Sequence, residues 1–218
     1  MKKNPSISVH SNNAGRYDEQ IKEYNNFVHD VLFGMMFEFV KPKQKLLDIG
    51  IGTGLSSIRF SELGVNIYGL DASQEMLELC KAKLFAKQLK IFDITKDAIP
   101  YRDNFFHLAV AIGILNFFPS LSSIFLQVER IMKNNGIFTF TILPNIELLK
   151  TGQKKLPSFT KQQTPWGVPI YKHSAEYICH LLKLHSFELL KEQLIVVRTG
   201  ELDTPDMLLS LIVAKANK

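Results

Sequence analysis

Residues 46–55 read LLDIGIGTGL and residues 66–71 read NIYGLD, and these two stretches decide the fold. The apolar run before Gly50 predicts a buried strand, and the three closely spaced glycines that follow predict a tight turn into a helix. The second stretch predicts another strand, which ends in a carboxylate at Asp71. A strand, a glycine turn, a helix and a second strand ending in an acid together indicate a nucleoside-binding α/β unit.

The composition predicts a single domain over residues 1–218. Of these residues, 46% are hydrophobic and 22% are charged, which is the usual range for a globular α/β protein. The net charge of +5 and the pI of about 9.1 keep nucleic acid open as a partner. The densest lysine stretch, residues 81–90, fits a solvated helix and the loop after it, so nucleic-acid binding is not favoured.

The cysteines and the first residues predict a cytoplasmic protein. Cys80 and Cys179 are far apart in apolar helical patterns, which favours neither a disulfide framework nor a zinc site. Residues 1–13 lack the apolar segment of a secretion signal, and no apolar run is long enough to span a bilayer. We therefore expect a reducing cytoplasmic environment, no metal and no membrane span.

Hydrophobic periodicity predicts the order of the elements. Apolar residues at steps of three and four predict one long helix over residues 17–40. Strands and helices then alternate as far as residue 143, and the helix after the glycine turn is expected to begin at Leu55. This alternation predicts five successive strand-helix steps, which is typical of a parallel sheet covered by helices.

The last third of the chain breaks that alternation. Residues 144–171 are rich in Lys, Gln, Pro and Gly and lack periodicity, so we expect a lid-like insertion. Ser174 is expected to begin a final helix. Two adjacent apolar stretches, residues 187–197 and 206–216, predict an antiparallel pair of strands at the edge of the sheet.

The glycine turn distinguishes between ligand classes. A dinucleotide-binding turn reads G-x-G-x-x-G, whereas here Leu55 occupies the third glycine position and Asp48 precedes the first glycine. The resulting D-x-G-x-G-x-G pattern, from Asp48 to Gly54, resembles motif I of the class I S-adenosylmethionine-dependent methyltransferases. Because a sulfonium cofactor carries no phosphates, such a turn can face a methionyl carboxylate instead. A carboxylate at Asp71 would also repel a 2′-phosphate, which argues against an NADP-type ligand.

The resemblance extends beyond the turn. Asp71 and the following ASQEML are similar to the family's D-x-S-x-x-M-L run, IPYRDNFFHLAVAIGIL to its fourth-strand region, and ERIMKNNGIFTFTI to its fifth-strand segment. The similarity covers about residues 17–143 and, more loosely, the C-terminal strands. The pattern is closest to stand-alone small-molecule enzymes such as those of the ubiquinone and menaquinone pathways.

The resemblance implies a fold and a cofactor site. The expected fold is a Rossmann-like three-layer α/β/α sandwich with a seven-stranded, mostly parallel sheet whose last strand is antiparallel. The expected cofactor is S-adenosyl-L-methionine, with S-adenosyl-L-homocysteine as product. In the family the acid at the position of Asp71 binds the ribose hydroxyls, and Asp48 is expected to orient the ammonium group. The implied cofactor residues are Tyr17, Asp48, Gly50, Gly52, Thr53, Gly54, Asp71, Ala72, Met76, Asp93, Ile94, Ala111 and Ile112.

Candidate catalytic residues are few, because methyl transfer is an in-line displacement that needs a base only for a poor nucleophile. His173 is the best candidate for a general base, against the simpler interpretation that it is a capping or surface residue. Asn116, Trp166 and Tyr171 are candidate substrate contacts. His107 replaces the family's usual Asp at the far end of the fourth strand, where a surface or capping role is expected.

The sequence therefore predicts an S-adenosylmethionine-dependent methyltransferase that acts on a small-molecule acceptor. One alternative is an RNA or tRNA methyltransferase, which the pI and the lysines at positions 150, 154, 155 and 161 favour. Another is a non-catalytic cofactor-binding regulatory subunit, which Asn116 and the lack of an evident base favour. The pattern specifies neither the acceptor atom nor the oligomeric state.

Overall fold

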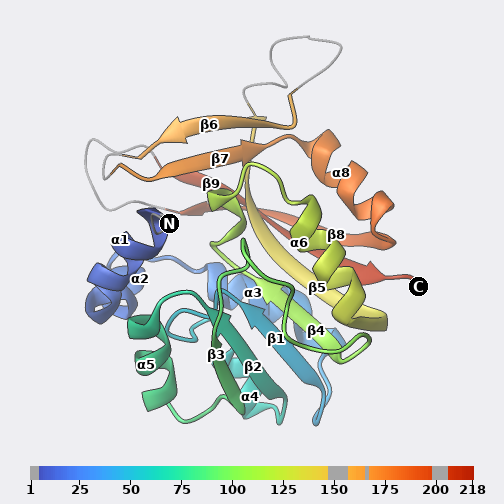
Figure 1. Cartoon of the computed structure of the whole chain (residues 1–218), viewed down its shortest axis with the longest axis horizontal. Coiled ribbons are helices and arrows are strands. Elements are labelled where there is room, and N and C mark those ends of the chain that lie inside the picture. The colour runs from blue at the N-terminus through green and yellow to red at the C-terminus, as the bar shows by residue number, and fades with distance from the viewer. Residues whose placement is uncertain (1–4, 147–156, 165–166, 198–205) are drawn as a thin grey trace.

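A single mixed sheet organises the structure, a computed structural model that describes residues 5–146, 157–164, 167–197 and 206–218. Five parallel strands run in the spatial order β3-β2-β1-β4-β5 (Figure 1). Their bounds are β1 Lys45–Ile49, β2 Asn66–Asp71, β3 Gln88–Ile91, β4 Phe106–Ala111 and β5 Met132–Pro144. This order reverses between β1 and β4, so the carboxyl ends of these two strands flank a ligand-binding crevice.

The two C-terminal strands complete the sheet as predicted. β9 (Met207–Ala216) pairs antiparallel with β5, with Thr139 opposite Val213. β8 (Phe187–Val197) pairs antiparallel with β9 at the edge. The antiparallel last strand and the edge pair are therefore confirmed.

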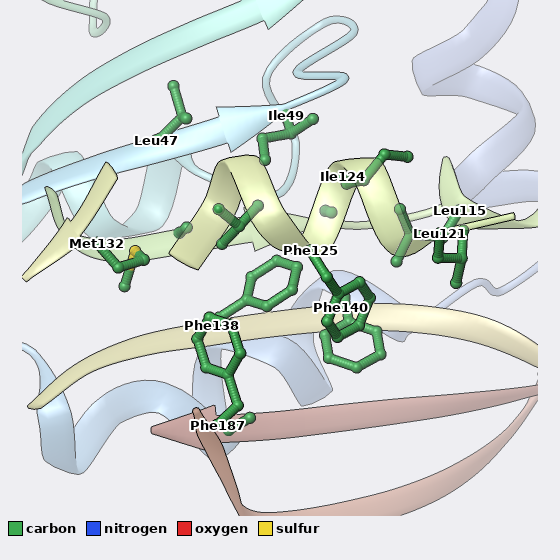
Figure 2. Packing of buried hydrophobic residues seen from close by; sticks show 14 of the residues in the cluster. Leu47, Ile49, Leu115, Leu121, Ile124, Phe125, Met132, Phe138, Phe140 and Phe187 are labelled. Atoms are coloured by element: carbon green, nitrogen blue, oxygen red, sulfur yellow. The ribbon is translucent and has the colours of Figure 1, made fainter. Parts of the chain in front are cut away.

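Helices cover both faces of the sheet, which confirms the three-layer sandwich. On one face, α6 (Ser122–Ile131) and α8 (Ala175–Leu184) pack against aromatic residues of the strands. Figure 2 shows Phe125 of α6 facing Phe138 and Phe140 of β5, with ring centroids 5.6 and 5.3 Å away. On the other face lie α3 (Val28–Met36), α4 (Ile58–Glu62) and α5 (Gln74–Ala82).

The prediction of one helix over residues 17–40 is wrong in its continuity. The segment forms α2 (Tyr17–Glu23), α3 and a 3₁₀ turn, η2 (Phe37–Phe39). Between α2 and α3, Asn25 adopts a left-handed φ of 47°, and the side chain of Asn26 accepts a hydrogen bond from the Val28 amide. Asparagine favours such local bonds over a continuous helix.

Short helices also precede this segment. α1 (Pro5–Asn13) and η1 (Ala14–Arg16) lie where the sequence predicts no element. Figure 1 shows α1 and α2 beside α5, and a hydrogen bond of 2.9 Å joins Ser11 Oγ to Ser73 Oγ.

The insertion at residues 144–171 contains regular structure that the sequence did not predict. β6 (Phe159–Gln163) and β7 (Pro169–His173) form an antiparallel hairpin, and β7 pairs parallel with the end of β5. The described sheet therefore has nine strands: the seven that were predicted and, in addition, β6 and β7. The exposed β6 reads FTKQQ, which carries no apolar alternation, so periodicity could not reveal it. Within the described ranges, no helix is both long and apolar enough to cross a membrane.

Candidate functional site

A cavity opens at the carboxyl ends of β1, β2 and β4. Its volume is about 840 Å³, including space open to solvent. Ligands bind at this edge in open α/β sheets because the strand order reverses there. The lining residues are Ile7, Tyr17, Gly50, Gly52, Leu70, Asp71, Ala72, Ser73, Met76, Phe92, Asp93, Ile94, Ile112, Gly113, Ile114, Phe117 and Phe118.

The glycine turn after β1 forms the floor of this cavity. Gly52 has a φ of 53°, and a Cβ atom added to it would meet only the Met76 sulfur, at 4.0 Å. Gly54 has a φ of 92°, and a Cβ atom there would lie 2.4 Å from the Phe85 ring. Gly52 therefore leaves room for a ligand against bare backbone, whereas Gly54 is required by packing.

The helix after the turn begins later than expected. α4 starts at Ile58 rather than at Leu55, and residues 51–57 form consecutive turns. The Gly54 amide bonds to the Ile51 carbonyl, and the Ser57 amide bonds to the Gly54 carbonyl. The amides near Leu55 therefore belong to a turn and not to a helix N-terminus.

Asp71 ends β2 at the rim of the cavity. Its Oδ2 accepts a hydrogen bond of 2.8 Å from the Gly52 amide, and its Oδ1 accepts one of 2.9 Å from the Ser73 amide. Ser73 in turn caps α5, where its hydroxyl accepts from the Met76 amide. Backbone donors on both sides thus hold the carboxylate beside the open space.

Apolar side chains line the cavity near Asp71, and we call this part of the lining the apolar slot. Ala72, Met76 and Ile94 line this slot. Asp93 also lines it, with its Oδ1 bound to Thr95 and its Oδ2 paired with Lys96 at 2.8 Å. The slot combines apolar walls with carboxylates at two points, an arrangement suited to a planar heterocycle joined to a sugar.

Asp48 lies behind the glycine turn instead of lining the cavity. It is 1% exposed, and its Oδ2 finds no hydrogen-bond partner among the described residues. Burial raises the pKa of Asp48 to about 7; the nearby Ser57 hydroxyl lowers the pKa in part, and the charge of Asp71 adds to the rise. A buried carboxylate oxygen without a partner fits a cationic ammonium group, reached directly or through water.

Tyr17 brings the N-terminal helices to the cavity. Its side chain lines the opening from α2, as Ile7 does from α1. Burial raises the pKa of Tyr17 to about 12, reinforced by the charges of Asp18, Asp71 and Asp48. The phenol is therefore neutral and can donate a hydrogen bond.

Asp18 was not predicted from the sequence, yet it holds the N-terminal helices in place. Its Oδ1 accepts a hydrogen bond of 2.5 Å from Thr53 Oγ1, and its Oδ2 pairs with Lys83 Nζ at 2.6 Å. One carboxylate thus joins α2 to the glycine turn and to the end of α5. Thr53 itself does not line the cavity. The only sequence signal for a role of Asp18 is that it directly follows Tyr17, a predicted cofactor residue.

Nine of the predicted cofactor residues line the cavity and four do not. The nine are Tyr17, Gly50, Gly52, Asp71, Ala72, Met76, Asp93, Ile94 and Ile112. Asp48, Thr53 and Ala111 are buried behind the cavity, and Gly54 packs against Phe85. Sequence reasoning missed the aromatic wall, Phe117 and Phe118, at and just after the short 3₁₀ helix η3 (Leu115–Phe117).

The predicted catalytic and substrate residues do not gather at the cavity. His173 is fully buried, its ring stacks on Tyr177 with centroids 5.8 Å apart, and burial lowers its pKa. Asn116 on η3 and Tyr171 on β7 are outside the lining, and Trp166 lies outside the described residues. His173 lies on β7, which packs against η3, and it is not among the residues that line the cavity, so its role as a general base stays a prediction.

Comparisons with known proteins relate the chain to methyltransferases. Residues 47–140 match the family described as "Methyltransferase domain". The biotin biosynthesis bifunctional protein BioHC of Saccharophagus degradans is 28% identical over 61% of the chain and 24% of the relative. The sterol 4-C-methyltransferase strm-1 of Caenorhabditis elegans is 25% identical over 73% of the chain and 53% of the relative.

A solved structure of magnesium protoporphyrin IX methyltransferase from Synechocystis with bound SAH superposes with a TM-score of 0.65. It is 15% identical, and the match covers 91% of this chain and 86% of that one. Residues 47–140 thus match a methyltransferase domain, and the chain as a whole has the fold of S-adenosylmethionine-dependent methyltransferases. The chain spans about a quarter to a half of the curated relatives it matches.

Asp48 predicts a distinct pH dependence of stability. Its pKa in the folded protein is about 7, above the unfolded value of about 3.9, so the folded state binds the proton more tightly. The free energy of unfolding of the cofactor-free protein should fall as pH rises from 5 to 8. Asp48→Asn should remove about 2–3 kcal/mol of this fall, as measured by urea unfolding. Asp103→Asn, at an exposed site, serves as control, and identical pH profiles for Asp48→Asn and the native protein would contradict the assignment.

Asp18 predicts an effect on cofactor retention. Asp18→Ala removes the bonds to Thr53 and Lys83, so the N-terminal helices should detach more readily from the glycine turn. Because the ion pair is partly exposed, we expect the binding free energy of S-adenosylhomocysteine to weaken by about 1 kcal/mol, which is about fivefold in affinity. Most of this loss should appear as faster dissociation. Stopped-flow dissociation would measure this, with Glu19→Ala as control. An unchanged dissociation rate would show that Asp18 does not hold these helices closed.

Proposed function

We propose that this protein transfers the methyl group of S-adenosylmethionine to a small, apolar acceptor by in-line displacement. The observation that carries the proposal is the cavity itself, where Asp71, held by the Gly52 and Ser73 amides, meets an apolar slot and an aromatic wall. When bound, the cofactor supplies an electrophilic methyl group on a sulfonium.

In this proposal, different residues of the chain bind different parts of the cofactor. Asp71 binds the two ribose hydroxyls with charge-assisted hydrogen bonds. Asp48 balances the ammonium group, and the free space above Gly52 admits the ligand against the backbone. Met76 and Ile94 exclude water from the two faces of the adenine.

The acceptor class follows from the rest of the lining. The remaining apolar part of the lining, which we take as the acceptor end of the cavity, consists of Ile7, Ile114, Phe117 and Phe118. Apart from Tyr17, Asp71 and Asp93, no described residue of the lining can titrate, and the phenol of Tyr17 is held neutral. The described lining therefore provides groups that position and desolvate an acceptor, and the only titratable groups among them besides Tyr17 are Asp71, held by backbone amides, and Asp93, paired with Lys96.

From this described lining we expect an acceptor atom that is nucleophilic without assistance, such as a carboxylate, a thiolate or a neutral amine, on an apolar body. Two of the similar proteins are named as a sterol and a protoporphyrin methyltransferase, which is compatible with an apolar acceptor. The lack of an evident base in the described lining also favours a second candidate, a subunit that binds the cofactor without catalysing transfer.

The test is a transfer assay with methyl-labelled S-adenosylmethionine against apolar carboxylic acids, thiols and amines, followed by cell extract. We expect label in an apolar product and the strongest turnover with one acceptor class. Phe117→Ala should raise the acceptor KM about tenfold or more while leaving cofactor affinity within twofold, because the ring lines the acceptor end. Phe37→Ala, an exposed aromatic residue, is the matched control and should change neither.

Three outcomes would contradict this proposal. Cofactor binding without label in any product would favour the non-catalytic subunit. Label in nucleosides of tRNA would favour the RNA methyltransferase. A tenfold change for Phe37→Ala but not for Phe117→Ala would place the acceptor elsewhere.

A further inference from the structure

A second cavity opens at the opposite edge of the sheet, by the amino ends of β1 and β4. Its volume is about 710 Å³, including space open to solvent. The basic side chains in its described lining are Lys41, His107, Lys133 and Lys215. β4 runs between the two cavities, since His107 lies near its amino end and Ile112 follows its carboxyl end.

Positive charge is in excess in this second cavity. Glu38 is the only acid in its described lining, and it pairs with Lys191, which lies outside the lining. Lys215 pairs with Glu188 at 3.2 Å. For Lys41 and Lys133 the described part of the chain provides no acidic partner within ion-pair distance. Two ammonium groups therefore lie uncompensated at one hollow of the surface.

His107 adds a donor that is fixed by the backbone. Its Nδ1 accepts a hydrogen bond of 3.0 Å from the Lys45 amide, so in the neutral ring the proton resides on Nε2. Nε2 lies 3.1 Å from Lys133 Nζ, which can only donate. The Nε2–H group of His107 and the ammonium group of Lys133 are thus both donors, and neither can accept a hydrogen bond from the other.

An oxyanion resolves this conflict, because separate oxygens can accept from the imidazole N–H and from the ammonium group. Burial lowers the pKa of His107, and the charges of Lys133 and Lys45 lower it further, whereas a bound anion would raise the pKa of the ring again. Lys41, at the mouth of the same cavity, is placed to add a third contact.

We propose that the cavity around His107, Lys133 and Lys41 is a binding site for a phosphate-type oxyanion, separate from the methyl-transfer site. The ligand is a phosphate ion or the phosphate group of a small molecule. Its recognition combines one neutral N–H donor with two ammonium groups.

Titration with inorganic phosphate in a chloride buffer tests this site in the protein of residues 1–218 without cofactor, so the result does not depend on methyl transfer. We expect saturable binding by NMR and calorimetry, with a rise in the pKa of His107 as phosphate binds, because a bound anion favours the charged ring. Lys133→Met should weaken binding at least tenfold. Lys87→Met, at an exposed lysine outside the described lining, should leave it unchanged.

Parallel titrations with AMP and with tRNA separate the sources of phosphate. Saturation by phosphate or AMP that depends on Lys133 supports the site. Non-saturable binding, equal binding by Lys133→Met and Lys87→Met, or a His107 pKa that does not move would overturn it. Binding of tRNA alone, with a steep salt dependence, would replace it with an extended RNA surface.

Discussion

The hydrogen bond from the Gly52 amide to Asp71 Oδ2 is the interaction on which the site depends. β1 and β2 pair in parallel with Ile49 opposite Leu70, and this register brings the turn after β1 next to the end of β2. The Gly52 amide can therefore reach Asp71. The turn can present its amide only because Gly52 adopts a left-handed conformation without a side chain in the cavity. The fold thereby places a fixed carboxylate beside open backbone, and the apolar slot and aromatic wall extend from that point.

The charges around this point explain how the N-terminal helices are retained. Three carboxylates, Asp48, Asp71 and Asp18, lie near the glycine turn, and they differ in the groups that bind them. Asp71 is stabilised by backbone amides, Asp18 by Thr53 and Lys83, and Asp48 is buried without a full set of partners. A cationic ligand would supply Asp48 with an opposite charge, and Asp18 joins the N-terminal helices to the same turn.

The sequence predicted those features that depend on short-range patterns. The glycine turn, the acid at Asp71 and the C-terminal antiparallel pair follow from spacing and periodicity within a few residues. The break at Asn25, the hairpin inside residues 144–171 and the contact between Asp18 and Thr53 depend on contacts that periodicity does not carry. The burial of His173 likewise depends on the pairing of β7 with β5, which joins distant parts of the sequence.

The central claim is that Asp71 and the adjoining glycine turn bind the adenosyl cofactor. Titration calorimetry of S-adenosylhomocysteine against the native protein and Asp71→Ala tests it most directly. We predict measurable binding by the native protein and a loss of about 2–3 kcal/mol in the variant, since a charged acceptor of two ribose hydroxyls is removed. Absence of binding by the native protein, or equal affinity in the two proteins, would contradict the account.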